Sequence, residues 1–150
     1  MKKLSILIVL FLTVSFTYAQ SDSDKKGVEK ACMNYIEGFY EGDEAKLKES
    51  LQPTLNKFGF WKDKKTGEYK QQDYMAYEKA LAYARNVLEK KQFAKPEAPK
   101  EVQVFDVGHV IASAKVRAWW GIDYILLSKR GDKWMIEQVI WEGPLEKPTH

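Results

Sequence analysis

The chain has 150 residues, of which 45% are hydrophobic and 13% aromatic, and its formal net charge is +3. This length suits one domain with one core. The charge is close to neutral, which excludes a global electrostatic basis for binding nucleic acid. A single cysteine, Cys32, excludes an internal disulfide. We predict that Cys32 is a buried, apolar core residue, with a reactive thiol or an intermolecular bridge as the alternatives.

Residues 1–19 are predicted to be a cleaved signal peptide and not part of the fold. Lys2 and Lys3 form a positive start, residues 4–16 form an apolar run, and small residues precede a cleavage point after Ala19. The apolar run is shorter than the roughly 20 residues that a membrane-spanning helix needs. We therefore expect residues 20–150 to be one exported domain, periplasmic or secreted, without a stable membrane anchor. Loss of the two lysines would lower the net charge from +3 to +1.

The first helix of the domain is predicted from the spacing of its apolar residues. From Val28 to Tyr40 these residues recur at alternating steps of three and one, which is typical of a helix with one buried face. Asp24 is the predicted N-cap and Gly42 the predicted C-cap. Cys32 falls on the apolar face of this helix.

Two further helices are predicted before the long β region. Asp43 is expected to cap a short second helix that stops before Pro53. Residues 55–61 are compatible with a short strand. A third helix is predicted over residues 74–91, with Asp73 as its cap.

Four consecutive strands are predicted in the last third of the chain, punctuated by Gly108, Gly121 and Gly131. They cover residues 102–107, 109–120, 122–129 and 133–141. Helices followed by such a meander predict an α+β fold in which three N-terminal helices pack on one face of a curved antiparallel sheet.

The alternation within two of these strands predicts what covers each face of the sheet. Over residues 110–120, one face is predicted to carry small or apolar residues: Val110, Ala112, Ala114, Val116, Ala118 and Trp120. The other face is predicted to carry Ile111, Ser113, Lys115, Arg117 and Trp119. The last strand is predicted to point Trp134, Ile136 and Ile140 one way and Met135, Val139 and Trp141 the other. Both of its faces are partly apolar, so we expect a homodimer in which a second subunit covers the outer sheet face.

Two motifs carry a resemblance to a known family. The run YIEGFYEGD at Tyr35–Asp43 resembles the end of the first helix in nuclear transport factor 2-like (NTF2-like or SnoaL-like) domains. The run IDYILLSKRGDKWMI at Ile122–Ile136 resembles their closing hairpin. The chain is most similar to the exported branch called "putative lumazine-binding". The resemblance implies a conical sheet wrapped around helices, a pocket inside the cone and frequent dimers.

The resemblance also suggests candidate catalytic residues. Enzymes of the ketosteroid isomerase type in this family use a tyrosine of the first helix, a carboxylate on an early strand and an acid on a central strand. Tyr35 matches the tyrosine and Asp123 is the candidate acid. The early carboxylate has no counterpart, because its place falls near Gly59. Tyr35 as an ordinary core residue and Asp123 as a structural acid are the competing interpretations.

Aromatic residues define a candidate ligand pocket, since the chain holds five Trp, eight Tyr and seven Phe. Stacking of a flat ligand and ordinary core or interface packing are both open as explanations. The candidate pocket residues are Tyr35, Phe39, Phe58, Phe60, Tyr77, Ala114, Trp120 and Trp134.

Three functions are compatible with these features. The favoured hypothesis is an exported domain whose aromatic-rich pocket binds a small organic ligand without catalysis. The second is an isomerase, dehydratase or cyclase that uses Tyr35 and Asp123. The third is a structural or partner-binding dimer module. We predict no cofactor and no metal site, because two histidines and one cysteine far apart do not form a zinc-binding pattern.

Overall fold

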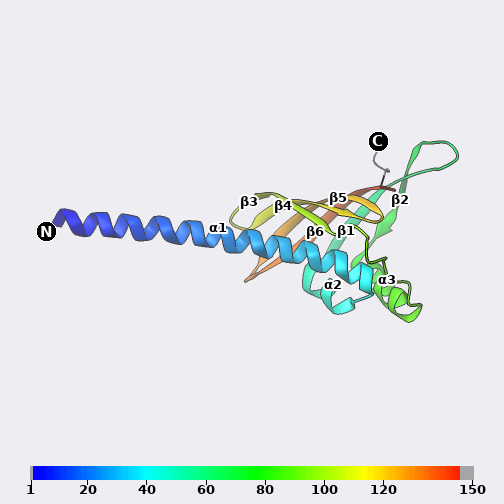
Figure 1. The fold of residues 1–150 in the computed structure, drawn as a ribbon, viewed down its shortest axis with the longest axis horizontal. Coiled ribbons are helices and arrows are strands. Elements are labelled where there is room, and N and C mark those ends of the chain that lie inside the picture. Colours follow the sequence, from blue (N-terminus) through cyan, green and yellow to red (C-terminus); the bar gives the residue numbers. More distant parts are fainter. Residues whose placement is uncertain (1, 146–150) are drawn as a thin grey trace.

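The computed structural model describes the backbone of residues 2–145 and the side chains of residues 22–145. Over this range the chain forms three helices and six strands in an α+β arrangement (Figure 1). The elements are α1 (Lys2–Glu41), α2 (Glu44–Ser50), β1 (Leu51–Lys62), β2 (Tyr69–Met75), α3 (Tyr77–Glu89), β3 (Glu101–Val107), β4 (Ile111–Ala118), β5 (Gly121–Arg130) and β6 (Lys133–Gly143).

The predicted signal peptide falls on residues 1–19, whose side chains lie outside the described part of the chain. None of the helices in the described part is both long enough and apolar enough to cross a membrane.

The six strands form one mixed sheet in the order β2-β1-β6-β5-β4-β3. Four of the five neighbouring pairs are antiparallel, but β1 runs parallel to β6. The prediction of a purely antiparallel sheet was therefore wrong at this pair. Consecutive strands joined by short turns must run antiparallel. The β1–β6 pair joins segments that are far apart in the sequence, so no turn constrains its direction.

The helices meet the sheet on the face that the alternation in β4 defines. Ala112, Ala114, Val116 and Ala118 are buried, whereas Ile111 is exposed, as predicted. Helix α1 contacts β3, β4 and β6. The alanines on this face carry only a methyl group, which lets the helix backbone approach the sheet closely. Figure 1 shows α1 lying along the sheet, with α2 and α3 near its C-terminal end.

A bulge in β6 changes which of its residues face inward. Leu126 pairs with Gln138 and Leu127 pairs with Ile136, so Glu137 is an extra residue in the ladder. Ile136 and Val139 are consequently both buried, and Ile140 is 39% exposed. The predicted alternation of this strand was wrong after Glu137, because a one-residue insertion moves every later side chain to the opposite face.

The ends of two helices differ from prediction. The predicted third helix starts at Tyr77 and not at residue 74, because residues 69–75 pair with β1 as strand β2. Asp24 lies inside α1 and is not its cap. Its buried carboxylate accepts hydrogen bonds from Lys129 Nζ at 2.5 Å and Trp134 Nε1 at 3.1 Å, which ties α1 to the β5–β6 hairpin.

The connection from α1 to α2 follows prediction. Asp43 accepts hydrogen bonds from the backbone N–H groups of Ala45 and Lys46 and so caps α2. Gly42, just before it, has a φ of 69°, the left-handed conformation that favours glycine after a helix.

The turn between β4 and β5 supplies a test of this fold. Gly121 has a φ of 152°, and a Cβ atom there would lie 1.9 Å from the carbonyl oxygen of Glu142 on β6. We expect Gly121→Ala to lower the free energy of unfolding by at least about 3 kcal/mol, because strain and a backbone clash combine. Gly131→Ala is the control: its φ is 62° with open space around it, so about 1 kcal/mol is expected. Urea unfolding of both variants measures the difference, and equal losses would contradict the packing described.

Candidate functional site

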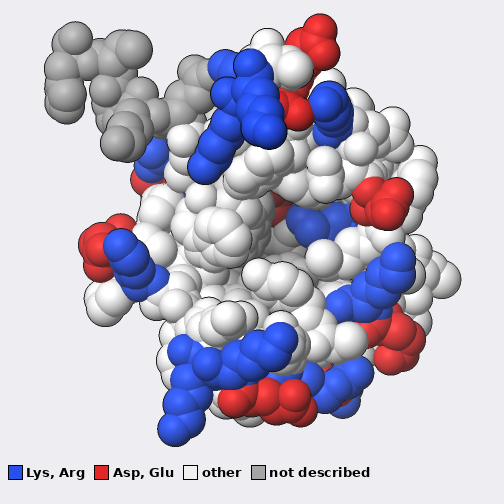
Figure 2. Space-filling view, turned by 90° about the vertical axis from the view of Figure 1, so that its right-hand side faces the viewer, with Lys and Arg blue, Asp and Glu red and all other residues white. Residues whose placement is uncertain are grey.

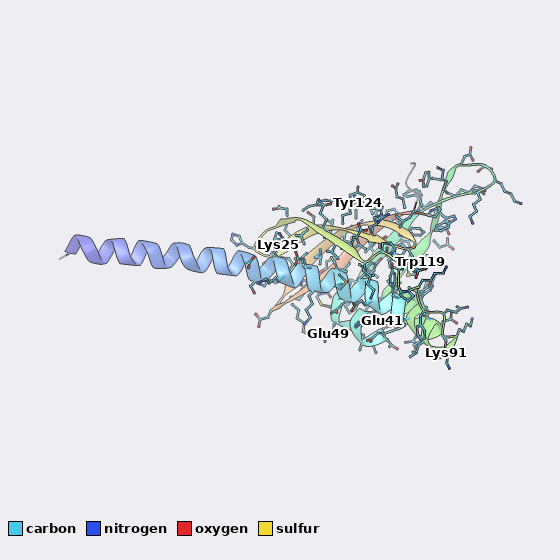
Figure 3. The ribbon with its side chains drawn as sticks, viewed as in Figure 1. Lys25, Glu41, Glu49, Lys91, Trp119 and Tyr124 are labelled. Carbon is cyan, nitrogen blue, oxygen red and sulfur yellow. The ribbon has the colours of Figure 1, made fainter. Side chains whose placement is uncertain are left out.

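A cavity of about 360 Å³ opens at the end of the molecule where the β4–β5 turn, α3 and the inner face of β1 meet. Figure 2 shows this end hollowed near its centre, with basic atoms in the depth of the hollow. Figure 3 shows Trp119 at the same end as α3. Most of the wall is aromatic. The lining residues are Phe39, Lys57, Trp61, Gln72, Asp73, Met75, Tyr83, Trp119, Trp120 and Trp141.

Lys57 brings a buried charge to this cavity. It lies on β1 between Leu55 and Gly59, and the pleat of the strand points all three inward. Its side chain is only 7% exposed. Among the described residues that line the cavity, it is the one with a basic side chain.

Tyr35 and Asp123 lie beneath Lys57, and the Asp123 carboxylate supplies the opposite charge. The Lys57 ammonium donates to Tyr35 Oη at 2.7 Å, and the Tyr35 hydroxyl donates to Asp123 Oδ2 at 2.5 Å. The ammonium and the same carboxylate oxygen are 3.6 Å apart. Tyr35 and Asp123 are both completely buried. A buried ion pair with a shared hydroxyl therefore connects α1, β1 and β5.

Trp120 completes the hydrogen bonding of this group. Its Nε1 donates to Asp123 Oδ1 at 2.8 Å, so each carboxylate oxygen has a donor. Within the described part, no buried side-chain nitrogen or oxygen lacks a hydrogen-bond partner. The Lys57–Tyr35–Asp123–Trp120 set, called here the buried network, is thus a group with satisfied hydrogen bonds.

Aromatic rings surround the ammonium group. Lys57 Nζ lies 5.5 Å from the centre of the Trp141 ring and 5.9 Å from that of Trp120, whereas it meets Tyr35 at the edge of the ring, through the hydroxyl. At these distances ring faces attract a cation, most strongly where water is excluded. The rings therefore replace part of the hydration that the lysine loses on folding.

Burial lowers the pKa of Lys57 and raises the pKa of Tyr35. Loss of hydration lowers the pKa of Lys57, and the negative charge of Asp123 acts against this shift. Burial, followed by the charge and hydrogen bond of Asp123, raises the pKa of Tyr35 well above its usual value. Tyr35 consequently stays a hydrogen-bond donor. Burial also raises the pKa of the fully buried Cys32 to about 12, which leaves its thiol protonated and unreactive.

Helix α1 holds the β4–β5 turn in place above the network. Tyr35, Phe39 and Tyr40 pack edge-on against Trp120, with ring centres 6.0, 5.8 and 5.7 Å away. The Tyr40 hydroxyl accepts from the backbone N–H of Trp119 at 2.8 Å and donates to the Pro99 carbonyl at 2.6 Å. The aromatic face of the first helix thus positions both tryptophans of the cavity rim.

The structure brings the two candidate catalytic residues together. On β5, Asp123 pairs with Val116 and Trp141, and its side chain lies on the helix-facing side with Ile125. It therefore faces Tyr35. Neither residue lines the cavity, because Lys57 and Trp120 stand between them and the open space.

The other predicted pocket residues are divided between the cavity and other places. Phe39 and Trp120 line the cavity. Phe58 and Phe60 point to the outer side of β1, where Phe58 packs on Tyr74 with ring centres 5.1 Å apart.

The last three candidates also lie away from the cavity lining. Ala114 is a core residue under α1, and Trp134 is buried against Gly27 and Asp24. Tyr77, at the start of α3, packs on the edge of the core.

Lys57 is the residue that the sequence analysis missed. The early carboxylate of the ketosteroid isomerase type was expected near Gly59, two positions further along. The signal was a lysine at an inward-facing position between Leu55 and Gly59. A strand that places a charged residue on its buried face needs a partner for that residue elsewhere in the fold.

A neighbouring cavity of about 510 Å³ shares Phe39, Tyr83 and Trp119 with the first. Its charged residues, Lys95 and Glu97, are exposed to solvent. It offers a ligand no desolvated polar group comparable with Lys57, so the first cavity is the better candidate site.

Removal of one charge from the buried network tests its energetics. Asp123→Asn leaves Lys57 buried without a counter-charge, and we expect a loss of about 3–5 kcal/mol in the free energy of unfolding. Adding Lys57→Met should restore part of that loss. Glu101→Gln is the matched control, because it breaks an exposed pair with Arg117 and should cost under about 1 kcal/mol. Urea unfolding measures all three, and a small effect of Asp123→Asn would refute the ion pair.

Comparisons with solved structures identify the fold. A protein of unknown function from Silicibacter pomeroyi, described as NTF2-like, superposes with a TM-score of 0.57 and 16% identity over 83% of this chain and 96% of its own. A second NTF2-like protein of unknown function, from Methylobacillus flagellatus, superposes with a TM-score of 0.58 and 14% identity over 79% of this chain and 90% of its own. A third, from Shewanella baltica, superposes with a TM-score of 0.55 and 16% identity over 78% of this chain and 90% of its own. At these identities the likeness concerns the fold alone.

Comparison of sequences identifies the family. No curated protein matches the chain significantly. The sequence profile of the family described as "Putative lumazine-binding" matches residues 23–142, which include every strand residue of the sheet except Gly143 and all of Tyr35, Lys57 and Asp123. The chain therefore belongs to the putative lumazine-binding family and has the nuclear transport factor 2-like fold.

Proposed function

We propose that this protein binds a small, flat organic ligand in the aromatic cavity, with an acceptor atom of the ligand against the Lys57 ammonium. The position of Lys57 carries this proposal, because it brings a desolvated donor to the wall of a cavity otherwise rich in rings. Apolar walls with a few polar groups at fixed positions are typical of small-molecule sites. The family description, which names lumazine, agrees with a flat heterocycle that carries carbonyl groups.

The cavity dimensions and walls support a small ring system. A volume of about 360 Å³ lies near the lower end of the usual range for ligand pockets, about 300–1,000 Å³. Trp61 and Trp141 pack at 6.2 Å between ring centres, and Trp119 and Trp120 at 5.8 Å. Indole faces favour flat, apolar or conjugated partners.

The hydrogen-bond geometry of Lys57 supports an acceptor group on the ligand. An ammonium group has three donor hydrogens. One serves Tyr35, and a second direction faces Asp123 at 3.6 Å. The third has no acceptor among the described residues, and in this proposal it serves a ligand carbonyl or carboxylate in the cavity. A charge-assisted hydrogen bond in a dry site contributes about 1.5–3 kcal/mol.

The alternative function is an isomerase-, dehydratase- or cyclase-type reaction that uses Tyr35 and Asp123. Their 2.5 Å contact favours it, since a hydroxyl and a carboxylate so placed could move a proton. Both oxygens, however, lie behind Lys57 and Trp120, and the Tyr35 proton is directed at Asp123 and not at the cavity. Ligand binding without catalysis is therefore the proposal we favour.

We further propose that the protein is exported and forms a homodimer through the outer sheet face. Its side chains lie away from the helices, as Figure 3 shows for Tyr124 relative to Glu41 and Glu49. Phe105 and Tyr124 stack there at 6.2 Å, and Leu126 and Ile140 are exposed beside them. Exposed apolar side chains gathered on one sheet face are typical of a subunit interface, and a second copy supplies a surface of matching chemistry. A partner-binding module is the alternative occupant.

Calorimetric titration with lumazine tests the ligand site. We expect one site per chain, and Lys57→Met should weaken binding at least about tenfold through loss of the charged donor. Trp61→Ala should also weaken it while leaving the buried network intact. Lys133→Met is the matched control, because this exposed lysine pairs only with Glu49 among described residues and should bind as the native protein does. Unchanged binding by folded Lys57→Met and Trp61→Ala proteins would refute the site.

Sedimentation of residues 20–150 tests the dimer. The native domain should sediment as a dimer, and Leu126→Lys should convert it to a monomer with unchanged helix content, because the charge would be buried in the interface. Lys133→Met changes a lysine that pairs with Glu49 of α2, away from this face, and should leave the dimer intact. A native domain that is monomeric at high concentration would refute the interface.

A further inference from the structure

We propose that Lys57 is a nucleophilic amine that captures an aldehyde or ketone group of the ligand as an imine. This inference rests on the proposed function, since it concerns the same cavity, and it adds a covalent step and a substrate class. It assigns the ligand a carbonyl carbon in contact with Nζ, not only an acceptor oxygen.

The position of Lys57 meets the first requirement, which is access to an amine in a dry environment. Lys57 lines the cavity, yet its side chain is only 7% exposed. Three aromatic rings lie within 6 Å of it. Lysines in such apolar pockets become nucleophiles, because poor hydration disfavours the ammonium form. The lowered pKa of Lys57 agrees with this.

The hydrogen bonds of the network meet the second requirement, which is a route for the ammonium proton. Lys57 Nζ donates to Tyr35 Oη at 2.7 Å, and Tyr35 Oη donates to Asp123 Oδ2 at 2.5 Å. A concerted shift along these two bonds leaves a neutral amine, an unchanged tyrosine and a neutral carboxylic acid. Tyr35 therefore acts as a positioning and relay residue, and no charge separates within the buried network.

The covalent step balances without an added reagent. The Nζ lone pair forms a bond to the carbonyl carbon, and the π electrons of the C=O bond move to its oxygen. Two of the three protons of the original ammonium leave with that oxygen as water, and one stays on nitrogen. The product is a protonated imine that keeps the positive charge of Lys57, so its pairing with Asp123 at the floor of the site persists.

The walls of the cavity select which carbonyl compounds would react. Indoles of Trp61, Trp119 and Trp141 favour a flat group conjugated to the carbonyl, and Gln72 and Asp73 add polar groups to the lining. We expect aromatic aldehydes to be the preferred class. A small hydrophilic aldehyde would gain little from these walls and should react with exposed lysines equally well.

Reductive trapping of the full chain tests the inference. The protein is incubated with naphthaldehyde and cyanoborohydride, which reduces the imine to a stable secondary amine, and peptide mass spectrometry locates the product. We expect a mass gain equal to the aldehyde less one oxygen atom, on Lys57, at least tenfold faster than on any exposed lysine. The corresponding naphthyl alcohol, which lacks the carbonyl, should compete for the cavity and slow the labelling.

Two variants separate the covalent step from simple binding. Tyr35→Phe keeps the amine and removes the relay, so labelling of Lys57 should slow at least tenfold while calorimetric binding of the naphthyl alcohol persists. In the Lys133→Met control, the aldehyde should label Lys57 at the same rate as in the native protein. Equal labelling of Lys57 in Tyr35→Phe and native protein would overturn the relay. The native peptide map locates the reactive lysine even if Lys57→Met does not fold.

The outcomes distinguish this inference from the proposed function. If the naphthyl alcohol and lumazine bind but Lys57 is not labelled, or is labelled no faster than exposed lysines, imine formation is refuted and the binding proposal stands. If neither compound binds and Lys57 is not labelled, both proposals fail.

Discussion

The buried ion pair between Lys57 and Asp123, bridged by the Tyr35 hydroxyl, is the constraint on which the rest of the structure depends. Two buried charges are costly unless each finds a partner, and an unpaired one costs several kcal/mol. Strand β1, strand β5 and helix α1 must therefore meet in one register. This requirement specifies where the first helix lies on the sheet, and it also leaves one cationic group at the wall of the cavity.

The features of the sheet around this pair bring the aromatic residues to it. The parallel contact of β1 with β6 places Gly59 opposite Trp141, where a Cβ atom would collide with the indole. The bulge at Glu137 sets the facing of the second half of β6. Gly121 permits the close approach of the β4–β5 turn to β6, so Trp120 can reach Asp123. The glycines at positions 59 and 121 thus lie against or beside Trp141 and Trp120, two residues of the cavity lining.

The candidate site could be predicted only in part. Tyr35 and Asp123 were accessible through motifs at the end of the first helix and in the closing hairpin, because both motifs are continuous in the sequence. The role of Lys57 could not be predicted, because it depends on contacts with Tyr35, 22 positions before it, and Asp123, 66 positions after it. Phe58 and Phe60 were plausible by composition, but the side of a strand that a residue occupies depends on register, and they point away from the cavity.

The sequence by itself determined what depends on neighbouring residues: the helical face from Val28 to Tyr40, the cap at Asp43, the four strands from Glu101 to Gly143 and their antiparallel hairpins. Periodicity and turn chemistry are local, so they can be seen in a single chain. Only the tertiary structure decided the β1–β6 pairing, the facing of β6 after its bulge and the meeting of Tyr35, Lys57 and Asp123. These depend on which distant backbone and charged groups satisfy one another inside the core, and no local pattern encodes that choice.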